Sequence, residues 1–123
     1  MLIAEDAHHG RARELFARAN LEQWRLITTN AVTYETYAVL LRRARHPRRA
    51  CMTFLDLIAA GSIPVERVTP ADEARAQALL RHHEDKSYSY CDASSFAMME
   101  RLRITDAIAF DRHFREYGHF TIL

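Results

Sequence analysis

The chain has 123 residues, and its 17 lysines and arginines against 16 aspartates and glutamates give a formal net charge of +1. This length fits one domain over residues 1–123, and the near-neutral charge means that any basic surface for nucleic acid must be local. No run of 18 apolar residues is present, which excludes a helical membrane span, and two widely separated cysteines fit reduced thiols and a cytoplasmic location.

Helices alternate with short strands in the predicted order of elements. The expected helices cover His8–Ala19, Val32–Arg43, Pro47–Ala60, Pro70–Arg81 and Cys91–Arg103, and the expected strands cover Trp24–Thr28, Ile63–Val68, Ala107–Phe110 and Phe120–Leu123, with a turn through Arg112–Gly118. Strands separated by helices pair in parallel, so the pattern predicts an α/β chain of three α/β/α layers around a central, mostly parallel sheet. Before the first helix the chain has only Met1–Ala4 and a few turn residues, so the N-terminal strand of such a fold is missing or incomplete.

Helix boundaries carry recognisable capping residues. The pair Thr29-Asn30 supplies an N-cap for the second helix, and Thr69-Pro70 combines an N-cap with a first-turn proline. Gly61 is placed to end the third helix.

The segment SYSYCDASSFAMMERLRITDAIAFDRHF, residues 87–114, places two carboxylates at the ends of two buried elements. Asp92 lies at the start of a helix with an apolar face, and Asp111 follows directly after a strand. Ligands bind at the carboxyl ends of strands in open α/β sheets, and carboxylates gathered there are stabilised by a hard divalent cation. The segment therefore predicts a metal-dependent site that acts on phosphate.

The motifs TTNAVTYETYAVLL, SYSYCDASSFAMM and AIAFDRHFREYG together resemble the PIN domain, in particular the VapC-type ribonuclease toxins of bacterial toxin–antitoxin pairs. The resemblance covers nearly the whole chain. It implies a magnesium- or manganese-dependent endoribonuclease, an RNA substrate, a small antitoxin protein as partner, and a homodimer.

The resemblance also assigns the site. Glu35, Asp92 and Asp111 match three of the family's four metal-binding carboxylates, so they are the candidate metal ligands and catalytic residues. The fourth, normally in a D-T-S or D-S-S motif on the first strand, has no counterpart in the sequence, and Glu5-Asp6 match the acidic turn that follows that strand. Ala109 stands where many relatives have a hydroxyl residue. Relative to the family, the chain looks N-terminally truncated, so we expect weak cleavage or none from these residues alone.

Each candidate also has a purely structural interpretation. Glu35 shares a helix face with Val32 and Val39 if the helix phase is right, and is otherwise an exposed helical residue. Asp92 is favoured at any helix N-terminus, although Ser87 or Ser89 can supply the cap instead. Asp111 suits a turn.

A basic cluster, LLRRARHPRR, bridges the end of one predicted helix and the start of the next. It contains Arg42, Arg43, Arg45, Arg48 and Arg49. Either it is a solvated corner, or it contacts RNA phosphates or a partner protein. A non-catalytic module that binds an antitoxin or RNA is the alternative to the nuclease.

Overall fold

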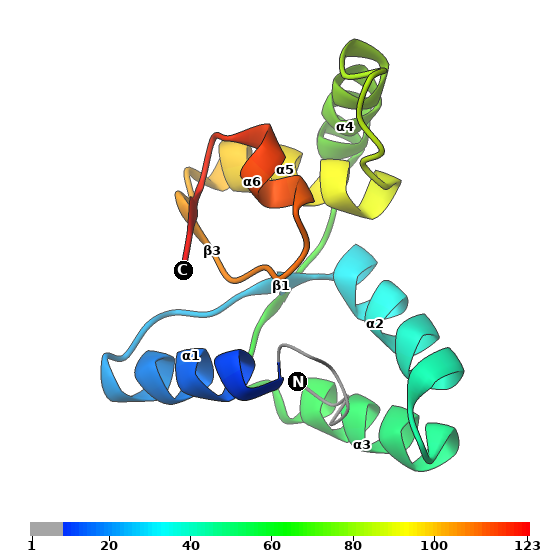
Figure 1. Cartoon of the computed structure of the whole chain (residues 1–123), viewed down its shortest axis with the longest axis vertical. Coiled ribbons are helices and arrows are strands. Elements are labelled where there is room, and N and C mark those ends of the chain that lie inside the picture. The colour runs from blue at the N-terminus through cyan, green and yellow to red at the C-terminus, as the bar shows by residue number, and fades with distance from the viewer. Residues whose placement is uncertain (1–8) are drawn as a thin grey trace. The chain divides into compact units, whose positions relative to one another are not determined.

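The computed structural model describes residues 9–123 (Figure 1). The predictions for Met1–Ala4 and for Glu5-Asp6 lie outside the described residues. The chain divides into two compact units, the first ending at Glu66 and the second spanning Arg67–Leu123, and each is described by itself. None of the described helices is long and apolar enough to cross a membrane.

The first unit consists of three helices and one pair of short strands. Its elements are α1 (His9–Leu21), β1 (Thr28–Thr29), α2 (Asn30–Arg43), α3 (Pro47–Ala60) and β2 (Val65–Glu66). Strands β1 and β2 pair in parallel with Thr28 opposite Val65. Helices α2 and α3 pack together, and their fully buried residues include Leu40 and Cys51, whose thiol donates to the carbonyl oxygen of Tyr37 at 3.8 Å.

The predicted caps of α2 and α3 are confirmed. The side chain of Thr29 accepts a hydrogen bond from the backbone nitrogen of Val32 at 3.0 Å, which satisfies one of the orphan amides at the start of α2. Gly61 ends α3 with φ = 75°, a left-handed conformation that residues with a Cβ rarely adopt.

The second unit also combines helices with one parallel strand pair. Its elements are α4 (Pro70–His82), α5 (Tyr90–Leu102), β3 (Asp106–Ala107), α6 (His113–Tyr117) and β4 (Thr121–Ile122). Asp106 pairs with Thr121 in β4. The core centres on Phe96, which is fully buried and stacks on Tyr117 with ring centroids 4.3 Å apart. This stack fixes α6 against α5.

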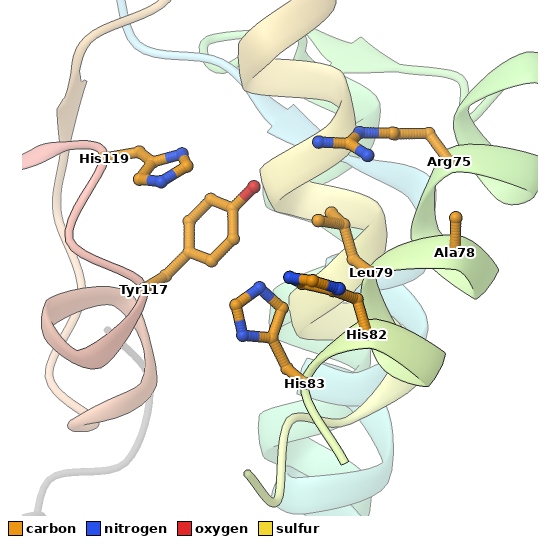
Figure 2. A pocket seen from close by; sticks show the side chains of 7 residues that line it. All are labelled: Arg75, Ala78, Leu79, His82, His83, Tyr117 and His119. Carbon is orange, nitrogen blue, oxygen red and sulfur yellow. The ribbon is translucent and has the colours of Figure 1, made fainter. Parts of the chain in front are cut away.

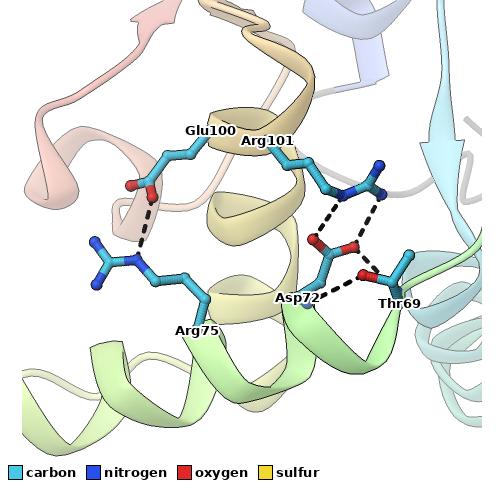
Figure 3. Close-up of polar contacts among 5 residues, drawn as sticks. All are labelled: Thr69, Asp72, Arg75, Glu100 and Arg101. Carbon is cyan, nitrogen blue, oxygen red and sulfur yellow. Dashed lines mark hydrogen bonds and ion pairs between the residues drawn. The ribbon is translucent and has the colours of Figure 1, made fainter.

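Polar contacts also join the elements of this unit (Figure 3). Arg101 on α5 donates two hydrogen bonds to the buried Asp72 on α4, at 2.8 and 3.0 Å. Arg75 and Glu100 form a second, more exposed ion pair at 3.3 Å, and the hydroxyl of Tyr117 donates to the same glutamate. These contacts hold α5 in place against α4.

The parallel pairing was predicted correctly, but the strand lengths were not. Each observed strand has two residues, whereas strands were expected over Trp24–Thr28, Ile63–Val68, Ala107–Phe110 and Phe120–Leu123. Strands β1 and β3 overlap the expected ranges only at Thr28 and Ala107. Each strand has one hydrogen-bonded neighbour, and Pro64, inside one expected strand, has no amide to donate to a ladder. The expected turn through Arg112–Gly118 contains the short helix α6.

Candidate metal-binding carboxylate site

Asp92 lies in the first turn of α5 as the third residue of a capping box. The backbone N–H of Ser89 donates to Oδ2 of Asp92 at 3.0 Å, and the backbone N–H of Asp92 donates to Oγ of Ser89 at 2.9 Å. Of Ser87 and Ser89, the two serines considered as caps, Ser89 is the N-cap of α5. The Asp92 side chain is 14% exposed, and the described residues give its other oxygen, Oδ1, no hydrogen bond.

Helix α4 contains a second capping box that serves as an internal comparison. Its N-cap Thr69 and its third residue Asp72 exchange the same two bonds, at 3.0 and 3.1 Å. The side chain of Asp72 is only 2% exposed, and Arg101 binds both of its oxygens. These hydrogen bonds from Arg101 hold the pKa of Asp72 below its ordinary value, against the opposing effect of burial.

The two boxes therefore differ in charge compensation. Asp72 is neutralised by an arginine, whereas the side-chain nitrogen that the described residues place near Asp92 is Nε2 of the His113 imidazole, 3.9 Å from Oδ2. That distance is too long for a hydrogen bond. Asp92 is a half-buried carboxylate whose charge is not balanced by a bonded protein cation, which is the electrostatic condition for binding a metal ion.

Asp111 contacts the backbone of the same histidine. Its Oδ1 accepts a hydrogen bond from the backbone nitrogen of His113 at 2.9 Å, just before α6 begins. Asp111 is exposed and its Oδ2 has no hydrogen bond within the described residues. Asp111 does not follow directly after a strand, since β3 ends at Ala107. Both aspartates nevertheless lie near His113, Asp111 at its backbone nitrogen and Asp92 at Nε2 of its ring.

His113 contacts both predicted aspartates, one through its backbone nitrogen and the other through its ring. Its side chain is 20% exposed, and its ring packs edge-on against Tyr88 with centroids 5.7 Å apart. Burial raises the pKa of Tyr88, with smaller contributions from nearby carboxylates that include Asp92. In the sequence, a histidine two residues after Asp111 does not by itself indicate a role in the site. Its relevance becomes visible only when the structure places its ring near Asp92.

Glu35 lies on α2, in the first unit. It is exposed, whereas Val32 and Val39 are half-buried, so the expected sharing of a buried face is not observed. The side-chain hydroxyl of the adjacent Thr36 donates to the carbonyl of Val32 at 2.8 Å, and no described residue forms an ion pair with Glu35. Its carboxylate is accordingly available for a ligand.

The donor set of the second unit fits magnesium or manganese rather than zinc. It provides carboxylate oxygens without bonded partners, and magnesium is commonly held by one or two carboxylates while it keeps several waters. Within residues 9–123 no three His, Cys, Asp or Glu side chains form a group that holds a metal by itself. Water and substrate oxygens would have to complete the coordination.

The second unit also has an open pocket of about 560 Å³ that is separate in its chemistry (Figure 2). Its lining consists of Arg75, Ala78, Leu79, His82, His83, Tyr117 and His119. No carboxylate lines it, so it does not supply the oxygen donors of the predicted site.

The family model of the PIN domain matches residues 1–119 of the chain. The chain therefore belongs to the PIN domain family, which confirms the expected α/β fold class with parallel strands. It is 36% identical over 115 residues to the 23S rRNA-specific endonuclease VapC20 from two strains of Mycobacterium tuberculosis, CDC 1551 / Oshkosh and ATCC 25618 / H37Rv. The match covers 94% of this chain and 84% of each relative.

A solved structure gives the same result. The crystal structure of M. tuberculosis VapC20, described as a sarcin–ricin loop cleaving toxin, superposes with a TM-score of 0.85 at 33% sequence identity. The likeness covers 98% of this chain and 89% of that one.

Proposed function

We propose that this chain is a toxin of the VapC type, an endoribonuclease that hydrolyses RNA phosphodiester bonds with a divalent cation, magnesium or manganese. The observation that carries the proposal is the contrast between the two capping boxes. The same backbone motif holds Asp72 and Asp92, yet only Asp72 is paired with an arginine. Arg101 balances the charge of Asp72 within the protein, whereas the charge of Asp92 is left for a bound cation to balance.

The residues of the proposed site have distinct roles in binding the cation. Asp92, Asp111 and Glu35 would hold the cation, with the two aspartates oriented by bonds from Ser89 and His113 backbone amides. When bound, the cation polarises the scissile phosphate and lowers the pKa of an attacking water. Because both amide bonds use only one oxygen of each aspartate, the second oxygen stays oriented at little entropic cost.

The names of the relatives support a proposal for the substrate. VapC20 is named for its action on 23S rRNA at the sarcin–ricin loop, and we propose a structured ribosomal RNA loop as the substrate here. We further propose a small antitoxin protein as inhibitor, a homodimer as the working form, and the cytoplasm as the compartment, where such an RNA is reached. A species that stays monomeric in sedimentation at micromolar concentration would exclude the dimer.

The decisive experiment is cleavage of a synthetic sarcin–ricin stem-loop in the presence of Mg²⁺ or Mn²⁺. We expect cleavage that EDTA abolishes and that Asp92→Asn lowers by at least about a hundredfold, since a metal ligand is lost. With three matching carboxylates the rate should be low. RNA or antitoxin binding with no metal-dependent cleavage, even after a first strand with its D-T-S or D-S-S aspartate is added, would replace the nuclease with a non-catalytic binding module.

A further inference from the structure

The corner between α2 and α3 concentrates positive charge in the first unit. Five arginines occupy it, and all are exposed: Arg42, Arg43, Arg45, Arg48 and Arg49. We call this set the arginine corner. From Thr36 to Leu55 the sequence contains no aspartate or glutamate. With these five set aside, the chain has 12 basic and 16 acidic residues out of its 17 and 16, so the net charge of +1 conceals a positive corner on an acidic protein.

No described acidic group neutralises this corner. The ion pairs among residues 9–123 involve other arginines, such as Arg11, Arg18 and Arg75, and none includes a member of the arginine corner. Five unpaired guanidinium groups on one short segment repel one another in water. A polyanionic ligand would remove that repulsion.

Helix stability explains only part of the arrangement. Arg42 and Arg43 lie in the last turn of α2, where cations interact favourably with the helix dipole. Arg48 and Arg49 lie in the first turn of α3, where the dipole is positive and cations are unfavourable, and no acidic residue offsets them there. The side chain of the N-cap His46 makes no capping hydrogen bond, so the first amides of α3 add to the positive field.

Helix α2 connects this charge to the proposed site. Glu35 and Arg42 are seven residues apart, which places them on nearly the same side of α2 and about 10 Å apart along its axis. A phosphate chain held at Glu35 through a cation would have its next few phosphates within reach of the corner. Planar guanidinium groups bind phosphate in bidentate fashion, whereas they have no comparable role beside an apolar peptide.

We propose that the arginine corner binds the phosphate backbone of the RNA substrate, a few nucleotides from the bond that is cut. This assignment rests on the proposed function, because Glu35 as a site residue provides the link. The contacts are to phosphates, so they position the RNA and do not read its sequence.

The test measures RNA affinity in full-length Asp92→Asn protein, which binds without cutting, at several salt concentrations. The variant adds Arg42→Gln, Arg45→Gln and Arg48→Gln. The matched control adds Arg13→Gln, Arg25→Gln and Arg67→Gln, which removes the same charge from exposed arginines that also lack described ion pairs. The probes are the sarcin–ricin stem-loop and a stem-loop of scrambled sequence, with a poly-glutamate peptide as a protein-like anion.

Each lost phosphate contact lowers the slope of log affinity against log salt by about 0.7 to 0.9. We therefore expect the corner variant to lose about 2 to 3 from this slope and at least about tenfold in affinity, equally for both stem-loops. The control should keep the native slope. If the corner variant unfolds, Arg43→Gln with Arg49→Gln gives a second test with a slope loss of about 1.5.

Two results overturn the assignment. One is a native salt slope in a folded corner variant, and the other is lost poly-glutamate binding with RNA binding intact, which identifies a protein surface. Cleavage by the wild-type chain is scored separately. If the wild type cleaves RNA with a metal and the corner variant keeps the native salt slope, RNA binding by the arginine corner is refuted and the nuclease function stands. If the corner variant loses salt slope but the wild type does not cleave, the nuclease function is refuted and RNA binding by the arginine corner is supported.

Discussion

The paired substitutions Asp92→Asn and Asp72→Asn separate metal binding from helix capping. Both replace the third residue of a capping box with an isosteric amide, whose oxygen still accepts from the N-cap amide. If the two aspartates differ only in burial, both variants should lose stability and neither should change metal binding. If Asp92 is a metal ligand, Asp92→Asn should lose metal binding and keep most of its stability, whereas Asp72→Asn should lose stability and keep metal binding.

The structure gives the expected magnitudes. Asp72→Asn weakens two bonds from Arg101, and charged hydrogen bonds are worth about 1.5–3 kcal/mol each. The Arg101 side chain is 37% exposed and can rehydrate, so we expect a smaller total, about 2–3 kcal/mol. Asp92→Asn keeps its cap and loses only a favourable charge at a helix N-terminus, about 0.3–1 kcal/mol. At roughly 3–5 °C per kcal/mol for this size, Tm falls by about 6–15 °C for Asp72→Asn and less than about 5 °C for Asp92→Asn.

The assay is thermal unfolding with and without Mn²⁺. A cation at a hundred times its Kd stabilises the folded state by about 2.7 kcal/mol. The wild type and Asp72→Asn should both show this rise in Tm, the latter from a lower starting point, and Asp92→Asn should lose it. Retention of the Mn²⁺-induced rise in Asp92→Asn, or its loss in Asp72→Asn, would refute the comparison of the two boxes.

Three further predictions concern stability. The pKa of Asp72 is lowered in the folded state, so its contribution to folding stability is complete above the ordinary carboxyl pKa of about 4 and is lost as pH falls through the lower folded pKa. Urea midpoints measured at pH 7, 4 and 2.5 should therefore fall less steeply in Arg101→Met than in the wild type. Phe96→Ala should cost about 3–5 kcal/mol in urea unfolding, because the ring is fully buried and stacked on Tyr117, and a cost under about 1 kcal/mol would contradict that packing. Gly61→Ala should destabilise by about 1 kcal/mol through backbone strain alone, since φ is 75° and a Cβ meets no atom within 4 Å.

Local chemistry made the helices predictable. The expected bounds of α3 agree with Pro47–Ala60, because a first-turn proline and a closing glycine define both ends within the segment itself. The expected start of α5, Cys91, is one residue late because Ser89 is the N-cap and Tyr90 is therefore the first helical residue. Strand lengths depend on what pairs with each strand, so the strand expected over Ala107–Phe110 was misjudged where the helices were not.

The roles of single carboxylates in the site likewise depend on distant residues and could not be predicted from the local sequence. The sequences T-P-A-D and S-Y-C-D are both capping boxes, and nothing within either four-residue motif says which aspartate is structural. The difference comes from Arg101, which lies 29 positions from Asp72 and reaches it only because α5 packs against α4. Family resemblance selected Asp92 from its motif. The physical reason for that choice, a carboxylate fixed in place but not neutralised, became visible only once the partners from distant positions were known.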